Sequence, residues 1–582
     1  MKIVLGAVNA KYIHSNLAVY SLRAYAKEYH EEIEIAEYTI NQQIDEILMD
    51  LYKRNPDILC FSCYIWNLDY IQELVKEVHK ILPNTVLWLG GPEVSYDSEE
   101  VLTRLPEVTG VMKGEGEKTF RELMKYYHGE GENLSVTDGI TYRTEDGRIC
   151  VNQWRPVMDL SEVPFVYDDM SLFRHKIIYY ETSRGCPFRC SYCLSSVDKC
   201  LRFRRMDLVK KELQYFLDQK VPQVKFVDRT FNCRHDHAME IWNYIYEHDN
   251  GVTNFHFEVS ADLLNEDELK LIGKMRPGLI QLEIGVQSTN PDTIREIHRT
   301  MDFEKLKKIV LRIEEKGNVH QHLDLIAGLP YEDYKSFGRS FNDVYELKPE
   351  QLQLGFLKVL KGSYMQEHAG EYGLVYKDRP PYEVLSTNWL SYGDIVRLKQ
   401  IEEIVEVYYN SGQFSHTLSR IVQEFDSPFS FFESFSLYYE MEGLFGRSHT
   451  RIARYEHLLH FIRKSVPEKE GFYKELLIYD LYLRENVKNR PDFAGEERID
   501  KKTLKEFYDE EEKNPVYLKD YGKCDSRKLR KMTHMEKFFY RVNGGMEQEE
   551  TLLVFDYQKR NPLNHEAAVM EISCKNTVKS IK

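Results

Sequence analysis

The chain has 582 residues, of which 42% are hydrophobic, and its formal net charge is −16. This length predicts three or four domains with a large buried core. An acidic chain is poorly suited to broad binding of nucleic acid, which depends on neutralising phosphates. The sequence has no run of about 18 apolar residues, so no transmembrane helix is predicted. The first residues turn polar too early for a signal peptide, so we expect a cytoplasmic protein.

Short apolar strands alternate with helical stretches over residues 1–130. This alternation is typical of an α/β domain with a mostly parallel, doubly wound sheet, as in Rossmann-like folds. A hairpin at 139–151 and a proline-containing linker follow, and together they occupy residues 131–175. The five expected strands of the first domain are 2–8, 32–38, 57–63, 85–91 and 108–114.

The same alternation resumes over residues 176–377. Six strand–helix units are enough for a partial (β/α)6 barrel of the TIM type, in which functional residues gather at the carboxyl ends of the strands. The six expected strands are 177–182, 223–228, 254–260, 279–285, 320–328 and 351–359.

Residues 378–582 are predicted to form a mainly helical domain, in which only 551–557 favours a strand. The segment Lys519–Arg541 carries eight Lys or Arg against three Asp or Glu, and we expect a solvated helix face there. The stretches with helical spacing of apolar residues are 389–410, 430–444, 448–464 and 469–485.

Three of the ten cysteines cluster in a loop directly after a predicted strand. Cys186, Cys190 and Cys193 follow the spacing CxxxCxxC within the segment SRGCPFRCSYC. Thiolates are soft ligands that suit zinc or iron–sulfur clusters. A structural zinc site normally takes four ligands, and Cys200 is the nearest candidate for a fourth. Three close thiols fit a 4Fe-4S cluster with one open iron better.

This segment resembles the radical SAM superfamily, whose CxxxCxxC motif carries an aromatic residue before the third cysteine, and the resemblance covers about 177–375. It implies that the open iron binds S-adenosylmethionine and that reduction of the cluster yields a 5′-deoxyadenosyl radical. It also implies further contacts to S-adenosylmethionine at the ends of the barrel strands. Each strand-end segment alone is equally compatible with a buried carboxylate or a turn glycine. The residues that match the family segments are Tyr192, Asp228, Ser260, Glu283, Gln287, Ile326 and Gly328.

The carboxyl ends of the first five strands also carry distinctive residues, and open α/β sheets bind their ligands there. The sequence lacks the glycine-rich phosphate motifs of dinucleotide and ATP sites. The segments SCYIWN, GGPEVS and GEGE resemble the cobalamin-binding domain that precedes many radical SAM barrels, and this resemblance covers about 1–130. It implies cobalamin binding by Asn9, His14, Ser62, Tyr64, Trp66, Gly90, Gly91, Glu93, Gly114 and Glu115.

One departure from the cobalamin-binding pattern concerns His14. The D-x-H-x-x-G motif that supplies a cobalt ligand in many relatives is absent, so the resemblance implies cobalamin bound without a histidine ligand. His14 would otherwise cap a helix or form a loop hydrogen bond. Trp66 packs either on the corrin or in the core. The C-terminal region resembles an uncharacterised domain attached to some cobalamin-dependent radical SAM proteins.

Together these resemblances imply an anaerobic enzyme that methylates an unactivated carbon through a 5′-deoxyadenosyl radical and methylcobalamin. Radical cyclisation or rearrangement with the same cofactors is the main alternative. RNA methylthiolation would need a second cluster in the N-terminal domain, where only Cys60 and Cys63 are available. A non-catalytic cobalamin or redox sensor is the remaining hypothesis. The expected partners are a small-molecule or peptide substrate and an electron donor such as flavodoxin or ferredoxin.

Overall fold

The computed structural model describes residues 1–544 and 546–572. The chain divides into two compact units, each of which combines two separate stretches of sequence. Within the described residues, no helix has the length and apolar character needed to cross a membrane. Unit 1 consists of Met1–Ser336 and Gly355–Ile395, and unit 2 consists of Phe337–Leu354 and Val396–Lys582.

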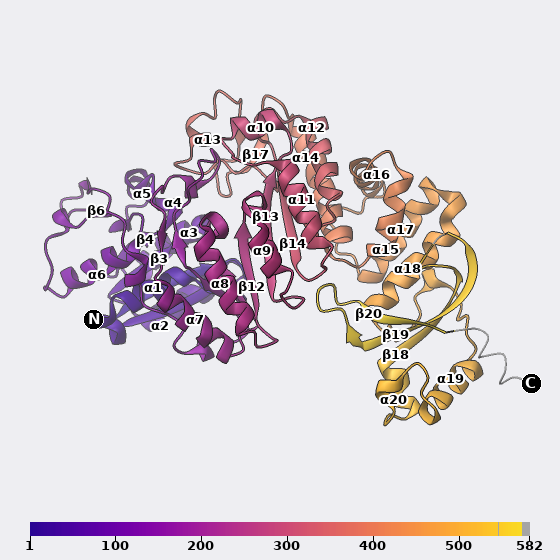
Figure 1. The fold of residues 1–582 in the computed structure, drawn as a ribbon. Coiled ribbons are helices and arrows are strands. Elements are labelled where there is room, and N and C mark those ends of the chain that lie inside the picture. Colours follow the sequence, from indigo (N-terminus) through magenta and orange to yellow (C-terminus); the bar gives the residue numbers. More distant parts are fainter. Residues whose placement is uncertain (545, 573–582) are drawn as a thin grey trace, which may run out of the picture. The chain divides into compact units, whose positions relative to one another are not determined.

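The N-terminal part of unit 1 is built on a seven-stranded sheet of order β2-β1-β3-β4-β5-β6-β7 (Figure 1). The first five strands run parallel, as predicted. Strands β1 and β3 are buried along their whole length, as expected for a sheet with helices on both faces. The strands are β1 (Ile3–Asn9), β2 (Ile33–Thr39), β3 (Ile58–Ser62), β4 (Val86–Gly90), β5 (Gly110–Met112), β6 (Ile140–Arg143) and β7 (Ile149–Val151).

The helices of this part are amphipathic. In α3 the apolar side chains of Leu68, Ile71, Val75 and Val78 recur every three or four residues, and all of them are buried. These side chains pack into the main core of the sheet. The helices are α1 (Leu17–Tyr25), α2 (Ile44–Arg54), α3 (Leu68–Ile81), α4 (Pro92–Ser95), α5 (Ser98–Arg104) and α6 (Gly116–Tyr127).

The predicted hairpin exists but does not stand apart from the first domain. Strand β6 pairs antiparallel with β5, and β7 pairs with β6, so the hairpin extends the N-terminal sheet. An edge strand presents unpaired backbone groups, which a following hairpin can satisfy. The sequence pattern shows the hairpin itself but not which edge it joins.

The central part of the chain contains a six-stranded sheet of order β8-β11-β12-β13-β14-β15, in which β8 to β14 run parallel and belong to unit 1. This arrangement confirms the expected partial barrel. In Figure 1, β12, β13 and β14 run side by side, with α9 and α11 beside them. The strands are β8 (Ile178–Tyr180), β11 (Gln223–Phe226), β12 (Asn254–Val259), β13 (Ile280–Gln287), β14 (His320–Ala327) and β15 (Gln351–Phe356).

Helices follow the barrel strands, and a short pair of strands frames the cysteine loop. Strand β9 (Ser183–Arg184) enters the loop, and β10 (Arg202–Phe203) leaves it and pairs with β9. The helices are α7 (Met206–Asp218), α8 (His235–Glu247), α9 (Glu266–Ile272), α10 (Pro291–Glu296), α11 (Phe303–Glu314) and α12 (Tyr334–Tyr345).

The last part of unit 1 follows the barrel strands and returns to the cysteine loop, where the Met365 N–H donates to the carbonyl of Ser191 (2.9 Å). It contains α13 (Tyr364–Glu367) and the antiparallel pair β16 (Val375–Tyr376) and β17 (Val384–Ser386).

The C-terminal region is mostly helical, as predicted. Helix α18 lies at its centre and is buried from Leu476 to Leu483. The helices are α14 (Tyr392–Ile404), α15 (Ser415–Ile421), α16 (Pro428–Met441), α17 (Arg451–Ser465), α18 (Glu470–Arg484), α19 (Lys501–Lys513) and α20 (Ser526–Met532).

Unit 2 also contains an antiparallel sheet that the sequence pattern largely missed. It comprises β18 (Thr533–Tyr540), β19 (Gln548–Arg560) and β20 (Ala567–Ile572), of which only the middle of β19 was predicted. The expected helix face over Lys519–Arg541 is wrong for its second half, which is β18. In this strand the half-buried His534 and Lys537 lie next to the buried side chains of Met535 and Phe538.

Candidate active site

The cysteine loop lies directly after β8, at the carboxyl end of the barrel sheet. Cys186 and Cys190 are buried, and Cys193 is half-buried. Their side chains line one cavity of about 200 Å³. The loop is held to the barrel by the Ser191 N–H, which donates to the carbonyl of Ile297 (2.9 Å). Cys200 is exposed and is not among the described residues that line this cavity.

Four of the predicted S-adenosylmethionine residues line the same cavity: Tyr192, Ser260, Glu283 and Gln287. The other three do not. Ile326 lies on β14, and Gly328 follows it with a φ of +92° beside Val384. A Cβ at Gly328 would come within 2.7 Å of Val384, so this glycine is required by packing.

Asp228, the seventh predicted residue, is fully buried behind the loop. Its carboxylate accepts hydrogen bonds from the N–H of Thr182 (2.9 Å) and from the hydroxyls of Thr182 (2.6 Å) and Ser183 (2.7 Å). Burial raises the pKa of Asp228 to about 7, although these hydrogen bonds oppose the shift. Its carboxylate is therefore committed to the residues that lead into the cysteine loop.

The cavity also contains charged residues that the sequence analysis did not select. Arg299 lies with Nη1 at 3.9 Å from Cys190 Sγ, and Arg229 pairs with Glu258 (2.9 Å). Cations beside thiols favour the thiolate form that binds metals. Neither arginine belongs to a recognisable motif, although Arg229 directly follows Asp228 at the end of β11.

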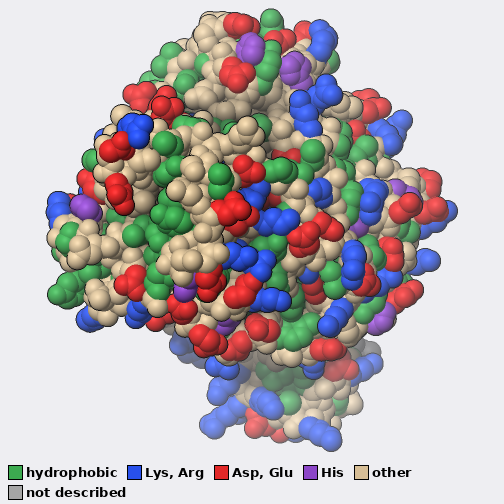
Figure 2. Space-filling model, turned by 90° about the vertical axis from the view of Figure 1, so that its left-hand side faces the viewer, with side chains coloured by type: hydrophobic (Ala, Val, Ile, Leu, Met, Phe, Trp, Pro, Cys, Tyr) green, Lys and Arg blue, Asp and Glu red, His purple; other side chains and the backbone are tan. Residues whose placement is uncertain are grey.

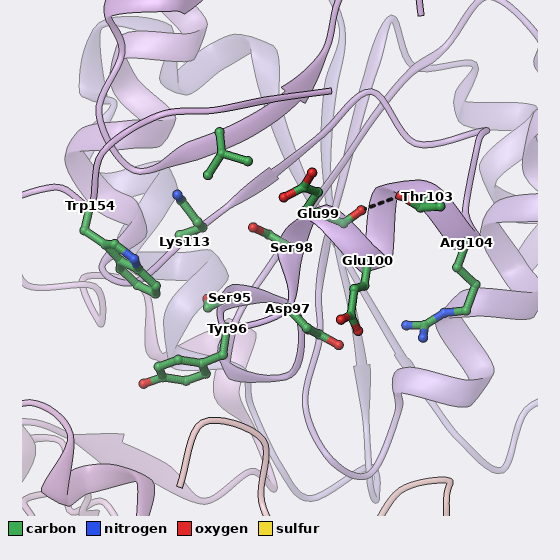
Figure 3. A pocket seen from close by; sticks show the side chains of 11 residues that line it. Ser95, Tyr96, Asp97, Ser98, Glu99, Glu100, Thr103, Arg104, Lys113 and Trp154 are labelled. Carbon is green, nitrogen blue, oxygen red and sulfur yellow. Dashed lines mark hydrogen bonds between the residues drawn. The ribbon is translucent and has the colours of Figure 1, made fainter. Parts of the chain in front are cut away.

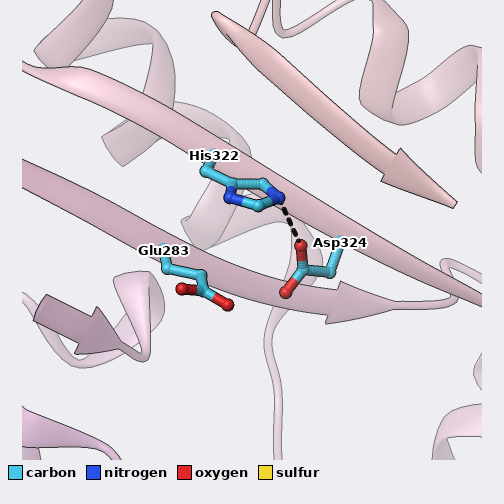
Figure 4. Close-up of side chains that lie close together, drawn as sticks. All are labelled: Glu283, His322 and Asp324. Atoms are coloured by element: carbon cyan, nitrogen blue, oxygen red, sulfur yellow. Dashed lines mark ion pairs between the residues drawn. The ribbon is translucent and has the colours of Figure 1, made fainter. Parts of the chain in front are cut away.

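A charged cluster forms the floor of this cavity on β13 and β14 (Figure 4). Glu283 and His322 are opposite each other in the strand pairing, and Asp324 lies two residues beyond His322 on the same strand. His322 and Asp324 form an ion pair of 3.0 Å. The ligand atoms of all three lie within 4.8 Å of one another, a spacing that could hold a metal ion.

Neighbouring basic side chains already contact the carboxylate of Glu283. Glu283 Oε2 lies 3.0 Å from Lys225 Nζ and 3.0 Å from His256 Nε2. Burial alone would raise the pKa of Glu283, but the hydrogen bond from His256 and the charge of Lys225 hold it well below its usual range. We therefore interpret the cluster as a fixed carboxylate floor rather than a cation site.

The carboxyl edge of the N-terminal sheet carries the predicted cobalamin residues. Tyr64 and Trp66 stack with ring centroids 4.4 Å apart, and Trp66 Nε1 donates to the carbonyl of Val8 (3.2 Å). Trp66 is 43% exposed, so it is not a core residue. At Gly91, where φ is +110°, a Cβ would come within 2.5 Å of the Cys63 carbonyl oxygen. Gly90 and Gly114 lie at the same edge of the sheet, at the ends of β4 and β5.

Several of the predicted cobalamin residues are engaged within the chain. Asn9 donates to the carbonyl of His14 (3.1 Å), and Ser62 accepts from Asn16 (2.9 Å). Burial raises the pKa of Glu93, although a hydrogen bond from Tyr382 opposes this shift.

Glu115 is engaged with two arginines of the barrel. It pairs with Arg202 (2.6 Å) and Arg184 (3.4 Å), which flank the cysteine loop. These ion pairs therefore link the N-terminal sheet to the loop that carries the three cysteines.

His14 also reaches the barrel rather than capping a helix. Its Nδ1 lies 2.6 Å from the hydroxyl of Tyr179 on β8. Burial lowers the pKa of His14, and the charges of Lys11 and Lys225 add to this effect.

A larger cavity of about 660 Å³ lies beside the same edge of the sheet, around α5 and the hairpin (Figure 3). Trp154 and Lys113 lie at one end and Arg104 at the other. Lys113 donates to the carbonyl of Asn152 (2.7 Å), and burial lowers its pKa. None of the ten predicted cobalamin residues lines this cavity.

The two cysteines of the N-terminal domain that were considered as ligands of a second iron–sulfur cluster lie in the core. Cys60 and Cys63 are 3% and 0% exposed. Burial raises the pKa of Cys60 to about 12 and that of Cys63 further. Inert, buried thiols of this kind do not favour a second iron–sulfur cluster.

On the face shown in Figure 2, acidic and basic side chains are interspersed.

Comparison with protein families identifies three matching regions. A B12 binding domain matches residues 3–124, and the radical SAM superfamily matches residues 180–344. Residues 370–555 match a family described as a protein of unknown function (DUF4080). The chain thus combines the two domains of cobalamin-dependent radical SAM enzymes, and the resemblance deduced from the sequence is confirmed.

Individual relatives are similar to parts of the chain. The cobalamin-dependent radical SAM methyltransferase TokK of Streptomyces tokunonensis is 24% identical over 56% of this chain and 51% of its own length. An anaerobic magnesium-protoporphyrin IX monomethyl ester cyclase of Rubrivivax gelatinosus is 22% identical over 53% of this chain and 57% of its own length. The chain therefore spans only about half the length of TokK.

Among solved structures, the cobalamin-dependent S-adenosylmethionine radical enzyme OxsB is similar over 82% of this chain and 80% of its own. The TM-score is 0.57 and the identity is 16%. The radical S-adenosylmethionine methyltransferase TsrM of Kitasatospora setae covers 66% of this chain and 79% of its own, with a TM-score of 0.52 and 17% identity. These similarities define the fold.

Proposed function

We propose that this protein is a cobalamin-dependent radical S-adenosylmethionine enzyme that methylates an unactivated carbon of its substrate. One observation carries the proposal. The thiols of Cys186, Cys190 and Cys193 share a single cavity with Tyr192 and Glu283 at the carboxyl end of a parallel sheet. Active sites of barrel enzymes lie at this end of the strands. The B12 binding domain precedes this barrel in the same chain and the same compact unit.

The residues present fit the three cofactors. Three thiols, with no fourth cysteine among the described residues of the cavity lining, suit a 4Fe-4S cluster that keeps one iron open. In the lining, Arg229 and Arg299 suit a carboxylate, and Glu258 suits an amino or hydroxyl group. When bound, the cofactors supply a 5′-deoxyadenosyl radical and a transferable methyl group.

The edge of the N-terminal sheet offers two features that suit cobalamin. The stacked rings of Tyr64 and Trp66 present an apolar surface, part of it exposed. Gly91 keeps the backbone of the β4 turn against Cys63, where any side chain would clash. This close packing fixes the path of the turn that follows β4 at this edge.

The protein's own contribution is to bind, orient and shield these groups. The backbone bond from Ser191 to Ile297 and the ion pairs of Arg184 and Arg202 with Glu115 hold the cysteine loop in place. The half-buried carboxylates of Glu283 and Asp324 are each paired with a basic side chain, which restricts their movement. A rigid, largely buried site limits side reactions of a radical with water.

Anaerobic reconstitution with iron, sulfide and cobalamin tests the proposal. S-adenosylmethionine and a reductant are added, and 5′-deoxyadenosine and S-adenosylhomocysteine are quantified by mass spectrometry. We expect 5′-deoxyadenosine from the wild type and none when Cys186, Cys190 and Cys193 are all replaced by Ala. Cys200→Ala is the matched control and should retain activity, because Cys200 is exposed and outside the cavity.

The products also separate methylation from its alternative. Cobalamin-dependent S-adenosylhomocysteine would support methyl transfer. Radical cyclisation or rearrangement is the second candidate, because the relatives of this chain include a cyclase. It predicts 5′-deoxyadenosine without S-adenosylhomocysteine once the substrate is present. If fully loaded protein releases neither product, the proposal of an enzyme fails and a cobalamin or redox sensor takes its place.

The remaining proposals concern partners. The cluster would receive its electron from a low-potential donor such as flavodoxin or ferredoxin, and the substrate would be a small molecule or a peptide. RNA methylthiolation is not favoured, because Cys60 and Cys63 lie in the core.

A further inference from the structure

A line of hydrogen bonds runs from the start of the cysteine loop into helix α8. Asp228 accepts from the hydroxyl of Thr182 (2.6 Å), and the oxygen of this hydroxyl lies 3.0 Å from Nε2 of His237. Asp228 and Thr182 are 0% exposed, and His237 is 2% exposed. A proton can therefore reach Asp228 only through its hydrogen-bonded neighbours.

The direction of each hydrogen bond follows from the chemistry of the groups. An ionised carboxylate only accepts, so the proton of the Thr182 hydroxyl points toward Asp228. The Thr182 oxygen then accepts, and neutral His237 carries its proton on Nε2. Nδ1 of His237 is left as a bare acceptor with no hydrogen-bond partner among the described residues. A buried imidazole nitrogen without a partner is uncommon and calls for an explanation.

His237 borders a cavity of about 400 Å³ that is separate from the cysteine cavity. This second cavity lies at the beginnings of α7 and α8, and the exposed side chains of Arg205 and Arg234 form part of its lining. Arg234 stacks over the ring of Phe203 at 3.7 Å. The histidine thus stands between a solvent-accessible cavity and the buried Thr182–Asp228 pair.

We propose that Asp228 takes up a proton when the neighbouring iron–sulfur cluster is reduced, and that His237 and Thr182 conduct this proton from the second cavity. The inference rests on the cluster proposed at Cys186, Cys190 and Cys193. The cluster gains one electron from a low-potential one-electron donor, and the protein gains one proton from solvent.

The proton moves by successive transfers along the line. A solvent proton binds Nδ1 of His237, the Nε2 proton passes to the Thr182 oxygen, and the Thr182 proton passes to Asp228. Afterwards Asp228 is neutral, and His237 carries its proton on Nδ1. Every group keeps its number of protons except the carboxyl, which has gained one. This account explains why Nδ1 of a buried histidine has no partner.

Electrostatics favours the coupling. Cys233 interacts electrostatically with both Cys186 and Asp228, so reduction adds negative charge to the surroundings of this carboxylate. A nearby negative charge raises a carboxyl pKa. The pKa of Asp228 is already raised to about 7 by burial, so a modest further rise protonates it at physiological pH. Burial lowers the pKa of His237 to about 4, so the imidazole stays neutral and conducts by exchanging its tautomer.

Other titratable or charged groups surround this line on three sides. Tyr180 and Glu181 on β8 interact electrostatically with Asp228, as does Cys233, which follows β11. Arg234 and Glu240 act on His237. Glu181 is paired with Arg184 (2.9 Å), and the pKa values of Tyr180 and Cys233 are raised by burial, so neither is a proton acceptor near pH 7.

The test is the midpoint potential of the reconstituted cluster, followed by electron paramagnetic resonance between pH 6 and pH 9. In the wild type we expect the potential to fall by about 59 mV per pH unit in the range where Asp228 titrates, because each unit is a tenfold change in proton activity. Asp228→Asn should make the potential independent of pH.

Asp262→Asn is the matched control and should retain the slope. Asp262 is also buried and acts on Arg299 beside Cys190, but it accepts from Ser260 and Asp302 instead.

Thr182→Val provides a second readout that does not depend on Asp228→Asn folding. Its hydroxyl lowers the pKa of Asp228, so its removal should move the pH-dependent range of the potential upward. A wild-type cluster with a pH-independent potential, or an unchanged slope in Asp228→Asn, would overturn this inference alone. Wild-type protein that assembles no cluster would overturn the proposed function together with it.

Discussion

Nδ1 of His14 lies 2.6 Å from the hydroxyl oxygen of Tyr179 and joins the loop after β1 to the first strand of the barrel. The backbone reinforces this junction, since the Ile177 N–H donates to the carbonyl of Ile13 (2.8 Å) and the Ser15 hydroxyl donates to the carbonyl of Ile177 (3.1 Å). The only histidine in the loop after β1 is therefore used to join the N-terminal sheet to the barrel sheet.

This contact leads to a prediction about cobalt. His14→Ala should bind cobalamin with unchanged stoichiometry, and the cob(II)alamin resonance spectrum should show no loss of nitrogen splitting, because we expect His14 to bond Tyr179 and not cobalt. Tyr179→Phe, which removes only the hydroxyl, should give the same spectrum. Nitrogen splitting that is present in the wild type and absent in His14→Ala would contradict the prediction.

Gly91 and Gly147 form a matched pair for testing the turn after β4. Both have positive φ, but a Cβ at Gly91 would meet the Cys63 carbonyl at 2.5 Å, whereas nothing lies within 4 Å at Gly147. Gly147→Ala should cost about 1 kcal/mol from backbone strain alone. Gly91→Ala should cost at least about 3 kcal/mol, because a backbone clash is added. Chemical denaturation measures both, and cobalamin titration should show weaker binding for Gly91→Ala only.

Glu283 should stabilise the fold in a pH-dependent way. Its folded pKa is depressed, so its contribution is present above the unfolded carboxyl pKa of about 4.3 and is lost as the pH falls below it. Glu283→Gln should destabilise the protein by about 1–3 kcal/mol at pH 7, since Lys225 and His256 lose their partner. The difference from the wild type should shrink at pH 3. Glu266→Gln, in an exposed pair with Arg312, should change stability by less than about 0.5 kcal/mol. A difference in stability between Glu283→Gln and the wild type that stayed constant with pH would refute the depressed pKa of Glu283.

Asp480 should be important for the stability of unit 2. It is 2% exposed and accepts from the N–H groups of His416 and Thr417 at the beginning of α15 (3.0 and 2.9 Å). Asp480→Ala leaves these buried donors unpaired and should cost about 2–3 kcal/mol. Asp500 accepts from the first turn of α19 at the surface, and Asp500→Ala should cost about 1 kcal/mol. Equal losses in thermal unfolding would mean that burial at Asp480 is unimportant.

The strands of both parallel sheets could be predicted because buried parallel strands are continuous apolar runs, as β1 and β3 are. The sheet of unit 2 was largely missed because the charged residues of β18 and the solvent-facing residues of β20 interrupt that pattern. Pairing partners are not encoded locally, so the attachment of the hairpin to β5 could not be predicted either.

The residues of the candidate site also fall into those that local sequence predicts and those that it does not. The spacing of the cysteines is local and predicts a shared cavity directly. The role of a strand-end carboxylate depends on which donors other strands bring to it, and these are not visible in the sequence. Asp228 therefore resembled a ligand contact, whereas its partners are Thr182 and Ser183. Arg299 was missed because only the folded loop brings it to Cys190.

The division of the chain into two interleaved units affects how its parts can be expressed separately or exchanged by recombination. Phe337–Leu354 belongs to unit 2, although the sequence on both sides of it belongs to unit 1. Within unit 2 the ring of Phe341 packs against Phe429 and Phe432. A gene fragment that begins at residue 378 would therefore encode a C-terminal region without part of its own core. Recombination could not exchange that region cleanly, and a ribosome makes the first stretch of unit 2 before it completes unit 1 at Ile395.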